Sequence, residues 1–255
     1  MKITADFRNR VLAREWLAGT WLNLGSAMTA EMAGVAGFDW VLLDHEHGPG
    51  SDTTISHQLQ AVAATPAAGI VRIAANDPAR IKRTLDAGAL GVMVPYVSTA
   101  EEAQAAVTAM RYPPRGIRGV ARLTRATGFG ADFDDYFAHA HERIVTIPQI
   151  ETAEGVKNAA AMAAIDGIDV LFVGPMDLST NFGLVGQFEH PRCIDAFKQV
   201  SAAARNAGKA AGILILNPAH VPICRELGYS FVALGSDGSS ANAGLRTAAA
   251  ALRGK

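Results

Sequence analysis

The stretch WVLLDHEHG, residues 40–48, runs from four apolar residues directly into a cluster of acids and histidines. Two later stretches, IVTIPQIET (residues 144–152) and VLFVGPMDL (residues 170–178), also place carboxylates just after an apolar run. A carboxylate is costly to desolvate unless it is paired or holds a metal. Carboxylates at the ends of three buried strands therefore indicate one polar functional site at one end of a barrel.

Apolar runs that alternate with Ala-rich amphipathic stretches predict the rest of the fold. Strands are expected near 20–24, 40–44, 69–73, 91–95, 144–151, 169–173, 211–216 and 230–234. Helices are expected near 5–18, 26–36, 52–64, 77–87, 99–110, 152–164, 191–207, 218–227 and 240–253. Apolar strands separated by helices are typical of a covered parallel sheet. Eight such units predict an α/β fold, the (β/α)8 TIM barrel, and without a linker residues 1–255 are interpreted as one domain.

Composition excludes several classes of partner. The formal net charge of −1 makes a nucleic acid partner improbable. Cys193 and Cys224, the only cysteines, form no disulfide framework, which fits a reducing cytoplasm. The first residues lack a signal-peptide core, and no apolar run reaches the length of a membrane span. We therefore expect a soluble cytoplasmic protein that acts on a small molecule and binds no membrane.

Glu151 and Asp177 are the candidate metal ligands. Gln149 and Glu151 lie two residues apart, so they point to the same side of their strand. Glu151 and Asp177 follow neighbouring strands, so their carboxylates can converge on one ion. Two carboxylates without a Cys or His cluster favour a hard cation, Mg²⁺ or Mn²⁺, completed by water and substrate oxygens. The alternative is a pair of capping or salt-bridged acids.

Arg72 and two histidines are the other candidates for chemistry. Arg72 lies in an apolar run, where its planar guanidinium must meet an anion. That anion is either a substrate carboxylate or enolate oxygen, or a structural partner, Asp44 or Glu46. His45 and His47 flank Glu46, and either can serve as a general base while the other is a satisfied core histidine.

Two further features bear on the reaction. None of the six lysines lies at the C-terminal end of a predicted strand, so Schiff-base chemistry is not expected and carbonyl chemistry should depend on a metal. The long connection at 111–143 carries four arginines, Arg115, Arg118, Arg122 and Arg125. A loop of this length is usually functional, here facing substrate or another subunit; the alternative is a solvated insertion with a short helix at 132–141.

Together these motifs resemble the HpcH/HpaI family of class II pyruvate aldolases. The resemblance rests on Asp44-x-Glu46-His47, Arg72, the segments 149–152 and 174–178, and further matches at 19–21, 36–40, 111–119 and 207–209. It implies a barrel of the phosphoenolpyruvate/pyruvate type that assembles as a homo-oligomer, usually a hexamer. The last helix would pack on a neighbouring subunit, near which Trp21 and the loop after Asp44 would lie.

The resemblance also implies roles for individual residues. The divalent metal, Mg²⁺, Mn²⁺ or Co²⁺, would be held by Glu151 and Asp177. His47 would be the base, helped by Asp44. The substrate-binding residues would be Arg72 on the carbonyl, Gln149 supporting the metal site, the backbone amides of Met176 and Asp177 on the carboxylate, and Trp21 and Leu216.

The expected function is that of a carbon–carbon lyase. It would reversibly join pyruvate or hydroxypyruvate to an aldehyde and give a 4-hydroxy-2-oxo acid. His45 stands where relatives have a small residue, the segment 48–50 also departs from them, and Ile73 follows Arg72 in place of a proline. These changes bear on the aldehyde. The alternatives are a lyase acting on acyl-CoA esters, which needs a basic groove, and a non-catalytic oxo-acid-binding barrel, which needs no base.

Overall fold

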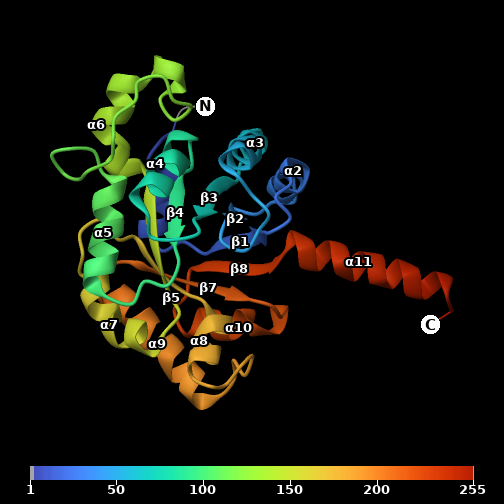
Figure 1. Ribbon diagram of the computed structural model, residues 1–255. Coiled ribbons are helices and arrows are strands. Elements are labelled where there is room, and N and C mark those ends of the chain that lie inside the picture. The colour runs from blue at the N-terminus through green and yellow to red at the C-terminus, as the bar shows by residue number, and fades with distance from the viewer. Residues whose placement is uncertain (1–2, 255) are drawn as a thin grey trace.

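Eight parallel strands close into a barrel in sequence order, with β8 pairing back to β1 (Figure 1). The computed structural model describes residues 3–254. The strands are β1 (Leu17–Leu22), β2 (Trp40–Asp44), β3 (Ala68–Arg72), β4 (Gly91–Val94), β5 (Val145–Ile150), β6 (Val170–Val173), β7 (Ala210–Ile215) and β8 (Phe231–Ser236). The predicted TIM barrel is confirmed, and each predicted strand lies within a few residues of an observed one.

Helices lie around this barrel between successive strands. They are α1 (Asp6–Leu12), α2 (Ala27–Val35), α3 (Asp52–Val62), α4 (Pro78–Asp86), α5 (Ala100–Met110), α6 (Phe133–Arg143), α7 (Ala153–Ala163), α8 (Pro175–Asn181), α9 (Pro191–Asn206), α10 (Val221–Glu226) and α11 (Asp237–Leu252), with short 3-10 turns η1 (Gly128–Gly130) and η2 (Pro218–His220). The helix predicted to reach residue 18 ends at Leu12, because β1 starts at Leu17. Helix α8 was missed, because its seven residues are too few to show a helical period.

The barrel interior is filled by aromatic rings. Trp40 stacks on Phe231 with ring centroids 3.9 Å apart, and Trp21 and Phe172 contact the edges of these rings. Gly19 of β1 makes room for the Trp40 ring, which a Cβ at that position would overlap. The interior is therefore a packed floor rather than a channel, and substrate access is restricted to the barrel ends.

Helix caps fix where each loop leaves the C-terminal end of its strand. Ser51 caps α3 by accepting a hydrogen bond from the Thr54 N–H, and Thr152 caps α7 by accepting one from Gly155. At α5, Thr99 and Glu102 form a reciprocal capping box. These caps hold the short loops after β2, β4 and β5 in defined conformations, and the loops after β2 and β5 carry acids of the site.

The closing helix α11 projects away from the barrel (Figure 1). Every residue in it is exposed or half-buried, and Leu245 and Leu252 point large apolar side chains into solvent. Its start is anchored, because Asp237 accepts hydrogen bonds from the Asn23 N–H and the Thr29 hydroxyl. Within residues 3–254 no helix is long and apolar enough to span a bilayer.

The long connection at 111–143 is ordered around a buried arginine. Arg118 is 1% exposed, donates to Asp86 at 2.7 Å and lies over the rings of Tyr112 and Tyr136. Arg125 donates to the backbone carbonyls of Ala87 and Leu59. Two of the four loop arginines thus serve the fold, and the predicted short helix at 132–141 is α6.

Candidate active site

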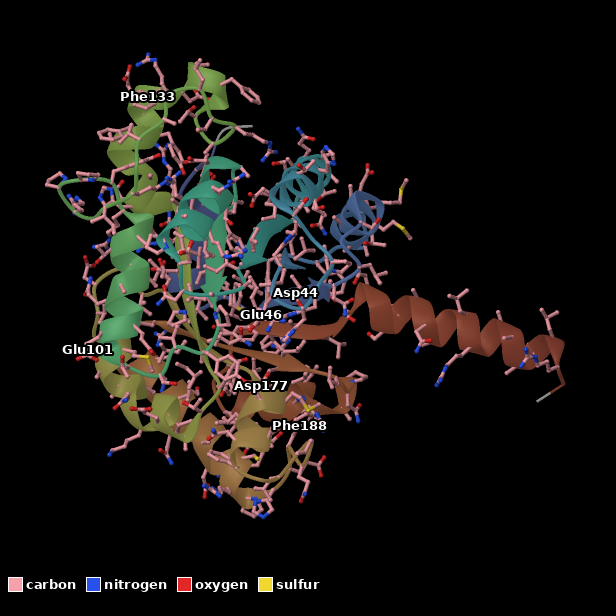
Figure 2. All side chains as sticks on the ribbon, viewed as in Figure 1. Asp44, Glu46, Glu101, Phe133, Asp177 and Phe188 are labelled. Carbon is pink, nitrogen blue, oxygen red and sulfur yellow. The ribbon has the colours of Figure 1, made fainter. Side chains whose placement is uncertain are left out.

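The candidate site lies at the C-terminal end of the barrel, where Asp44, Glu46 and Asp177 gather over the strand ends (Figure 2). Asp44 and Arg72 are the last residues of β2 and β3 and are register partners in the sheet. Glu151 directly follows β5, and Asp177 lies in the first turn of α8 after β6. The structure therefore brings together the charged residues that the sequence placed at four separate strand ends.

Arg72 is the single buried cation of this group. Its Nε and Nη2 donate to the two carboxylate oxygens of Asp44 at 3.0 and 2.7 Å, and its Nη1 lies 2.9 Å from Glu46 Oε2 in an ion pair. Arg72 thus contacts both acids, Asp44 and Glu46, that the sequence offered as its structural partners. Burial acts to raise the pKa of Asp44, but the Arg72 hydrogen bonds and charge outweigh it and leave that pKa lowered.

Glu151 lies at the centre of the site. Its carboxylate accepts two hydrogen bonds, but the nearby charge of Arg72 does not balance its burial. It is 1% exposed, accepts a hydrogen bond from the side-chain amide of Gln149, and accepts the backbone N–H of Tyr96 at 3.1 Å. Burial, followed by repulsion from Asp177, raises the pKa of Glu151 to about 8. Burial also raises the pKa of Glu46, against the attraction of Arg72.

Three observations support a fit between these residues and a hard cation. Gln149 Oε1 is buried and has no hydrogen-bond partner within the described chain, so an acceptor is free beside the acids. Gly174 makes room for Glu151 Oε1, which a Cβ at that position would overlap. Three carboxylates, Asp44, Glu46 and Glu151, interact with the Arg72 guanidinium, and Asp177 adds a fourth negative charge near Glu46 and Glu151. Oxygen donors with excess negative charge are the ligands that Mg²⁺ and Mn²⁺ prefer.

The protein itself offers few ligands to such an ion. In the part of the chain that the structure describes, no cluster of three or more His, Cys, Asp or Glu side chains is arranged to hold a metal. Two carboxylates leave most of an octahedral shell to water and substrate oxygens, which is the usual arrangement for Mg²⁺. The arrangement suits a metal that meets its substrate directly.

Sequence reasoning missed Tyr96, which contacts both candidate metal acids. Its hydroxyl lies 3.3 Å from Asp177 Oδ1, in addition to its backbone contact with Glu151. Tyr96 follows β4 by two residues, so its place at a strand end was a signal that could have identified it. Tyrosine is common both in cores and on surfaces, which is why the pattern alone did not distinguish it.

The two histidines of the β2 loop lie in different environments. The His47 side chain is 69% exposed, with Nε2 4.0 Å from Glu46 Oε2, and its backbone N–H donates to Asp44. His45 Nε2 pairs with Gln58 Oε1 of α3 at 3.1 Å, and burial lowers the pKa of His45. Gly50 makes room for this ring, which a Cβ would overlap. His47 is therefore free to meet a substrate, while His45 ties the loop to α3.

The remaining candidates border the same end of the barrel. Trp21 is buried beneath the site, with its ring 5.6 Å from Arg72 Cζ. Met176 lies in the first turn of α8, where backbone N–H groups lack intrahelical acceptors. Leu216 follows β7 by one residue and is 57% exposed. The four lysines that the structure describes, Lys82, Lys157, Lys198 and Lys209, lie on helices or before β7, away from this end.

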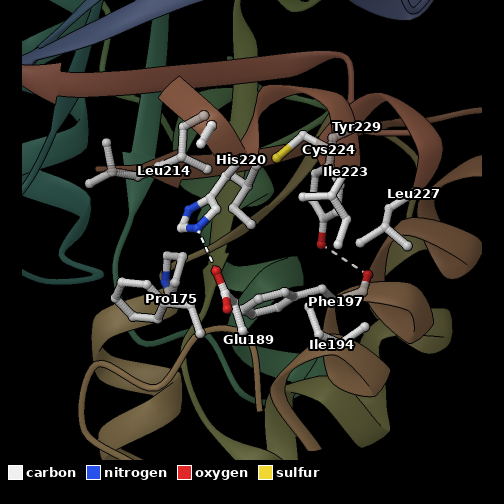
Figure 3. A pocket seen from close by; sticks show the side chains of 14 residues that line it. Pro175, Glu189, Ile194, Phe197, Leu214, His220, Ile223, Cys224, Leu227 and Tyr229 are labelled. Carbon is white, nitrogen blue, oxygen red and sulfur yellow. Dashed lines mark hydrogen bonds and ion pairs between the residues drawn. The ribbon is translucent and has the colours of Figure 1, made fainter. Parts of the chain in front are cut away.

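An apolar cavity of about 250 Å³ lies elsewhere, between α8, α9 and α10 behind β7 (Figure 3). Its wall includes Ile213, Phe197 and Tyr229, and the His220–Glu189 ion pair spans part of it. These wall residues belong to the layer between strands and helices, outside the barrel interior. The cavity holds no cluster of convergent polar groups, so we place the chemistry at the barrel mouth instead.

Comparison with known proteins points to one family. A family model described as HpcH/HpaI aldolase/citrate lyase matches residues 17–243. The chain is 44% identical to a pyruvate aldolase from Rhizobium etli, over 91% of each chain. It is 46% identical to a hydroxypyruvate/pyruvate aldolase from Chromohalobacter salexigens, over 86% of each chain. A solved HpcH/HpaI aldolase/citrate lyase family protein from Burkholderia cenocepacia superposes with a TM-score of 0.93 at 38% identity, covering 98% of this chain and 100% of that one.

Proposed function

The chain belongs to the HpcH/HpaI aldolase/citrate lyase family, and from this premise we propose that it is a metal-dependent class II pyruvate aldolase. Its reaction is the reversible aldol addition of pyruvate or hydroxypyruvate to an aldehyde, giving a 4-hydroxy-2-oxo acid. The metal would be Mg²⁺, Mn²⁺ or Co²⁺, held by Glu151 and Asp177. The observation that carries the metal proposal is the buried, hydrogen-bonded Glu151 beside the like charge of Asp177.

A divalent cation bound there would act as a Lewis acid: it would polarise the 2-oxo group and stabilise the negative charge that develops on the enolate oxygen. Arg72 supplies the second positive charge. Nη1 and Nη2 each bear two N–H groups; Nη2 donates a hydrogen bond to Asp44, and Nη1 forms an ion pair with Glu46 Oε2 without a hydrogen bond. One N–H on each nitrogen therefore stays available for a substrate oxygen, so Arg72 can be an ion-pair partner and an electrophile at once.

His47 is the proposed base. In the cleavage direction it takes the proton of the C4 hydroxyl, directly or through a water molecule, as the C3–C4 bond breaks and the aldehyde leaves. Its ring is exposed, and the one ion-pair contact described for it is with Glu46 Oε2, 4.0 Å from Nε2. Asp44 supports it through the loop backbone, because its Oδ1 accepts the N–H groups of both Glu46 and His47.

Substrate contacts complete the proposal. The carboxylate of pyruvate is assigned to the backbone amides of Met176 and Asp177 at the start of α8, with Gln149 supporting the metal site. Trp21 forms the floor under Arg72. Leu216 is assigned to the side where the aldehyde enters. His45 contacts Gln58 of α3 instead, so its proposed effect on the choice of aldehyde acts through the position of the β2 loop.

Two alternatives fit the site less well. An acyl-CoA ester lyase needs a basic groove for the cofactor phosphates, but Arg118 is buried in an ion pair and Arg125 is engaged by backbone carbonyls. A non-catalytic oxo-acid-binding barrel needs the metal acids without a base, and the free His47 beside the site argues against it.

Removal of either metal acid tests the proposal. Glu151→Gln and Asp177→Asn each delete one anionic ligand while keeping shape, so turnover with Mn²⁺ should vanish in both. The matched control is Asp134→Asn, which alters an exposed carboxylate on α6 paired only loosely with Arg122 at 3.8 Å. Turnover at the wild-type rate by either site variant in metal-free buffer would refute the metal site.

We also propose that the protein is a homo-oligomer, expected to be a hexamer, in which α11 packs on a neighbouring subunit. The support is the exposed apolar side chains of α11, together with Met28, Met32 and Val35 on the outer face of α2, which are 67%, 63% and 74% exposed. Apolar surface of this kind is favourable to bury. The two buried thiols, Cys193 and Cys224, support a cytoplasmic location.

A further inference from the structure

Tyr96 adopts a backbone conformation that tyrosine rarely takes. Its φ is +53°, in the left-handed region that favours glycine. It lies in the loop after β4, is 54% exposed and packs little of its ring into the core. Unfavourable backbone conformations of this type persist where surrounding contacts hold them, and they concentrate at functional sites.

The contacts that hold Tyr96 are the two candidate metal acids. Its backbone N–H donates to Glu151 Oε2 at 3.1 Å, and its hydroxyl donates to Asp177 Oδ1 at 3.3 Å. Glu151 follows β5 and Asp177 follows β6, so one residue from the β4 loop bridges acids from two other strand ends. The acids repel each other, and Tyr96 gives each of them a donor.

We propose that Tyr96 is a positioning residue that sets the metal affinity of the Glu151–Asp177 pair. This inference rests on the proposed metal-dependent function. Asp177 is only half-buried and would otherwise sample several rotamers, whereas the phenol fixes one of its oxygens and leaves the remaining lone pairs free for a cation. Partners that orient metal ligands in this way commonly change metal affinity by 10–100-fold when removed.

The test is a calorimetric titration of Mn²⁺ into metal-stripped protein without substrate. Tyr96→Phe removes only the hydroxyl, and we expect Mn²⁺ to bind about tenfold more weakly, at the low end of the usual range because the hydrogen bond is long. Tyr96→Gly also removes the phenol but keeps the N–H and relieves the left-handed backbone, so it should fold well and show a similar loss.

The matched control is Tyr229→Phe. Tyr229 is buried and donates to the Phe197 carbonyl, far from the acids, so its loss should lower Tm and leave Mn²⁺ affinity unchanged. Equal or tighter Mn²⁺ binding by both Tyr96 variants would overturn the inference while leaving the metal site intact. Absence of Mn²⁺ binding by the wild-type protein would overturn the metal-dependent function itself, and the inference with it.

Discussion

Arg72 donates two hydrogen bonds to Asp44, from Nε at 3.0 Å and from Nη2 at 2.7 Å, across the adjacent ends of β3 and β2. This two-pronged pair fixes the plane of the guanidinium, because Asp44 is itself held by the backbone N–H groups of Glu46 and His47. The same carboxylate thus orients the arginine and the loop that carries the base. Positions of Arg72 and His47 are therefore coupled through Asp44.

The base assignment predicts different outcomes for the two histidines. His47→Ala should lower kcat by roughly 10²–10⁴-fold, the usual effect of losing a general base. His45→Ala should keep most of kcat but lower Tm, because buried Gln58 loses its contact and costs about 1–3 kcal/mol. Steady-state assays with two or more aldehydes would also show whether His45 changes their relative use. An inactive His45 variant beside a normal His47 variant would reverse the assignment.

The raised pKa of Glu151 predicts how stability depends on pH in the metal-free protein. With a pKa near 8 in the folded state and about 4.5 as its ordinary value, Glu151 binds more protons folded than unfolded between these limits. Stability should therefore fall as pH rises through this window, by up to about 1.4 kcal/mol per pKa unit.

Glu151→Gln removes this titration and isolates its effect. Urea unfolding of metal-stripped protein should show the variant more stable than wild type at pH 8, with the difference shrinking toward pH 5. Added Mn²⁺ should stabilise wild type and leave the variant unchanged, since only wild type keeps both acids. If the stability difference between wild type and Glu151→Gln does not vary with pH, the raised pKa of Glu151 in the folded protein is contradicted.

The reaction should form no covalent bond to the protein. The lysines that the structure describes lie away from the barrel mouth, so borohydride added with pyruvate should leave the protein mass unchanged. A class I aldolase treated in parallel is the positive control. A pyruvyl-lysine adduct in the mass spectrum would refute the class II assignment.

Assembly should depend on the last helix. Truncation after Gly238 keeps the Asp237 anchor but removes the exposed Leu245 and Leu252. We expect smaller, inactive species by light scattering, because the apolar faces of α2 and α11 would lose their partners. Replacing Leu245 and Leu252 by serine is a milder variant that should weaken assembly in the same direction. An unchanged oligomer after truncation would count against intersubunit packing of α11.

The barrel and most of its charged site could be predicted from the sequence. Apolar runs, the stretches between them and the acids that directly follow the runs are all visible in short segments of the chain. The apolar runs before Asp44 and Asp177 predicted strands, and the acids after these runs predicted which end of the barrel carries the site. The partner of Arg72 could not be predicted, because the sequence allowed a substrate, Asp44 or Glu46. The register of β2 and β3 places Arg72 beside Asp44, and the fold of the loop after β2 brings Glu46 to the same guanidinium.

Features set by backbone conformation or three-dimensional packing could not be predicted. Tyr96 contacts Glu151 through a left-handed backbone that its residue type disfavours, so propensity argues against it. His45 turns away from the mouth because Gly50 leaves space beside α3, a relationship between positions five residues apart that has no periodic signature. Helix α8 spans only seven residues, too few for a helical period to be recognised in the sequence.

The most direct test of the account is pyruvate release from a 4-hydroxy-2-oxo acid by protein whose metal content has been removed and verified. Coupling to lactate dehydrogenase reports pyruvate continuously. We predict no release in EDTA and full recovery when Mn²⁺ is added in excess, with no recovery in Glu151→Gln. Undiminished pyruvate release by the metal-free protein would contradict the central claim that Glu151 and Asp177 hold the ion on which cleavage depends.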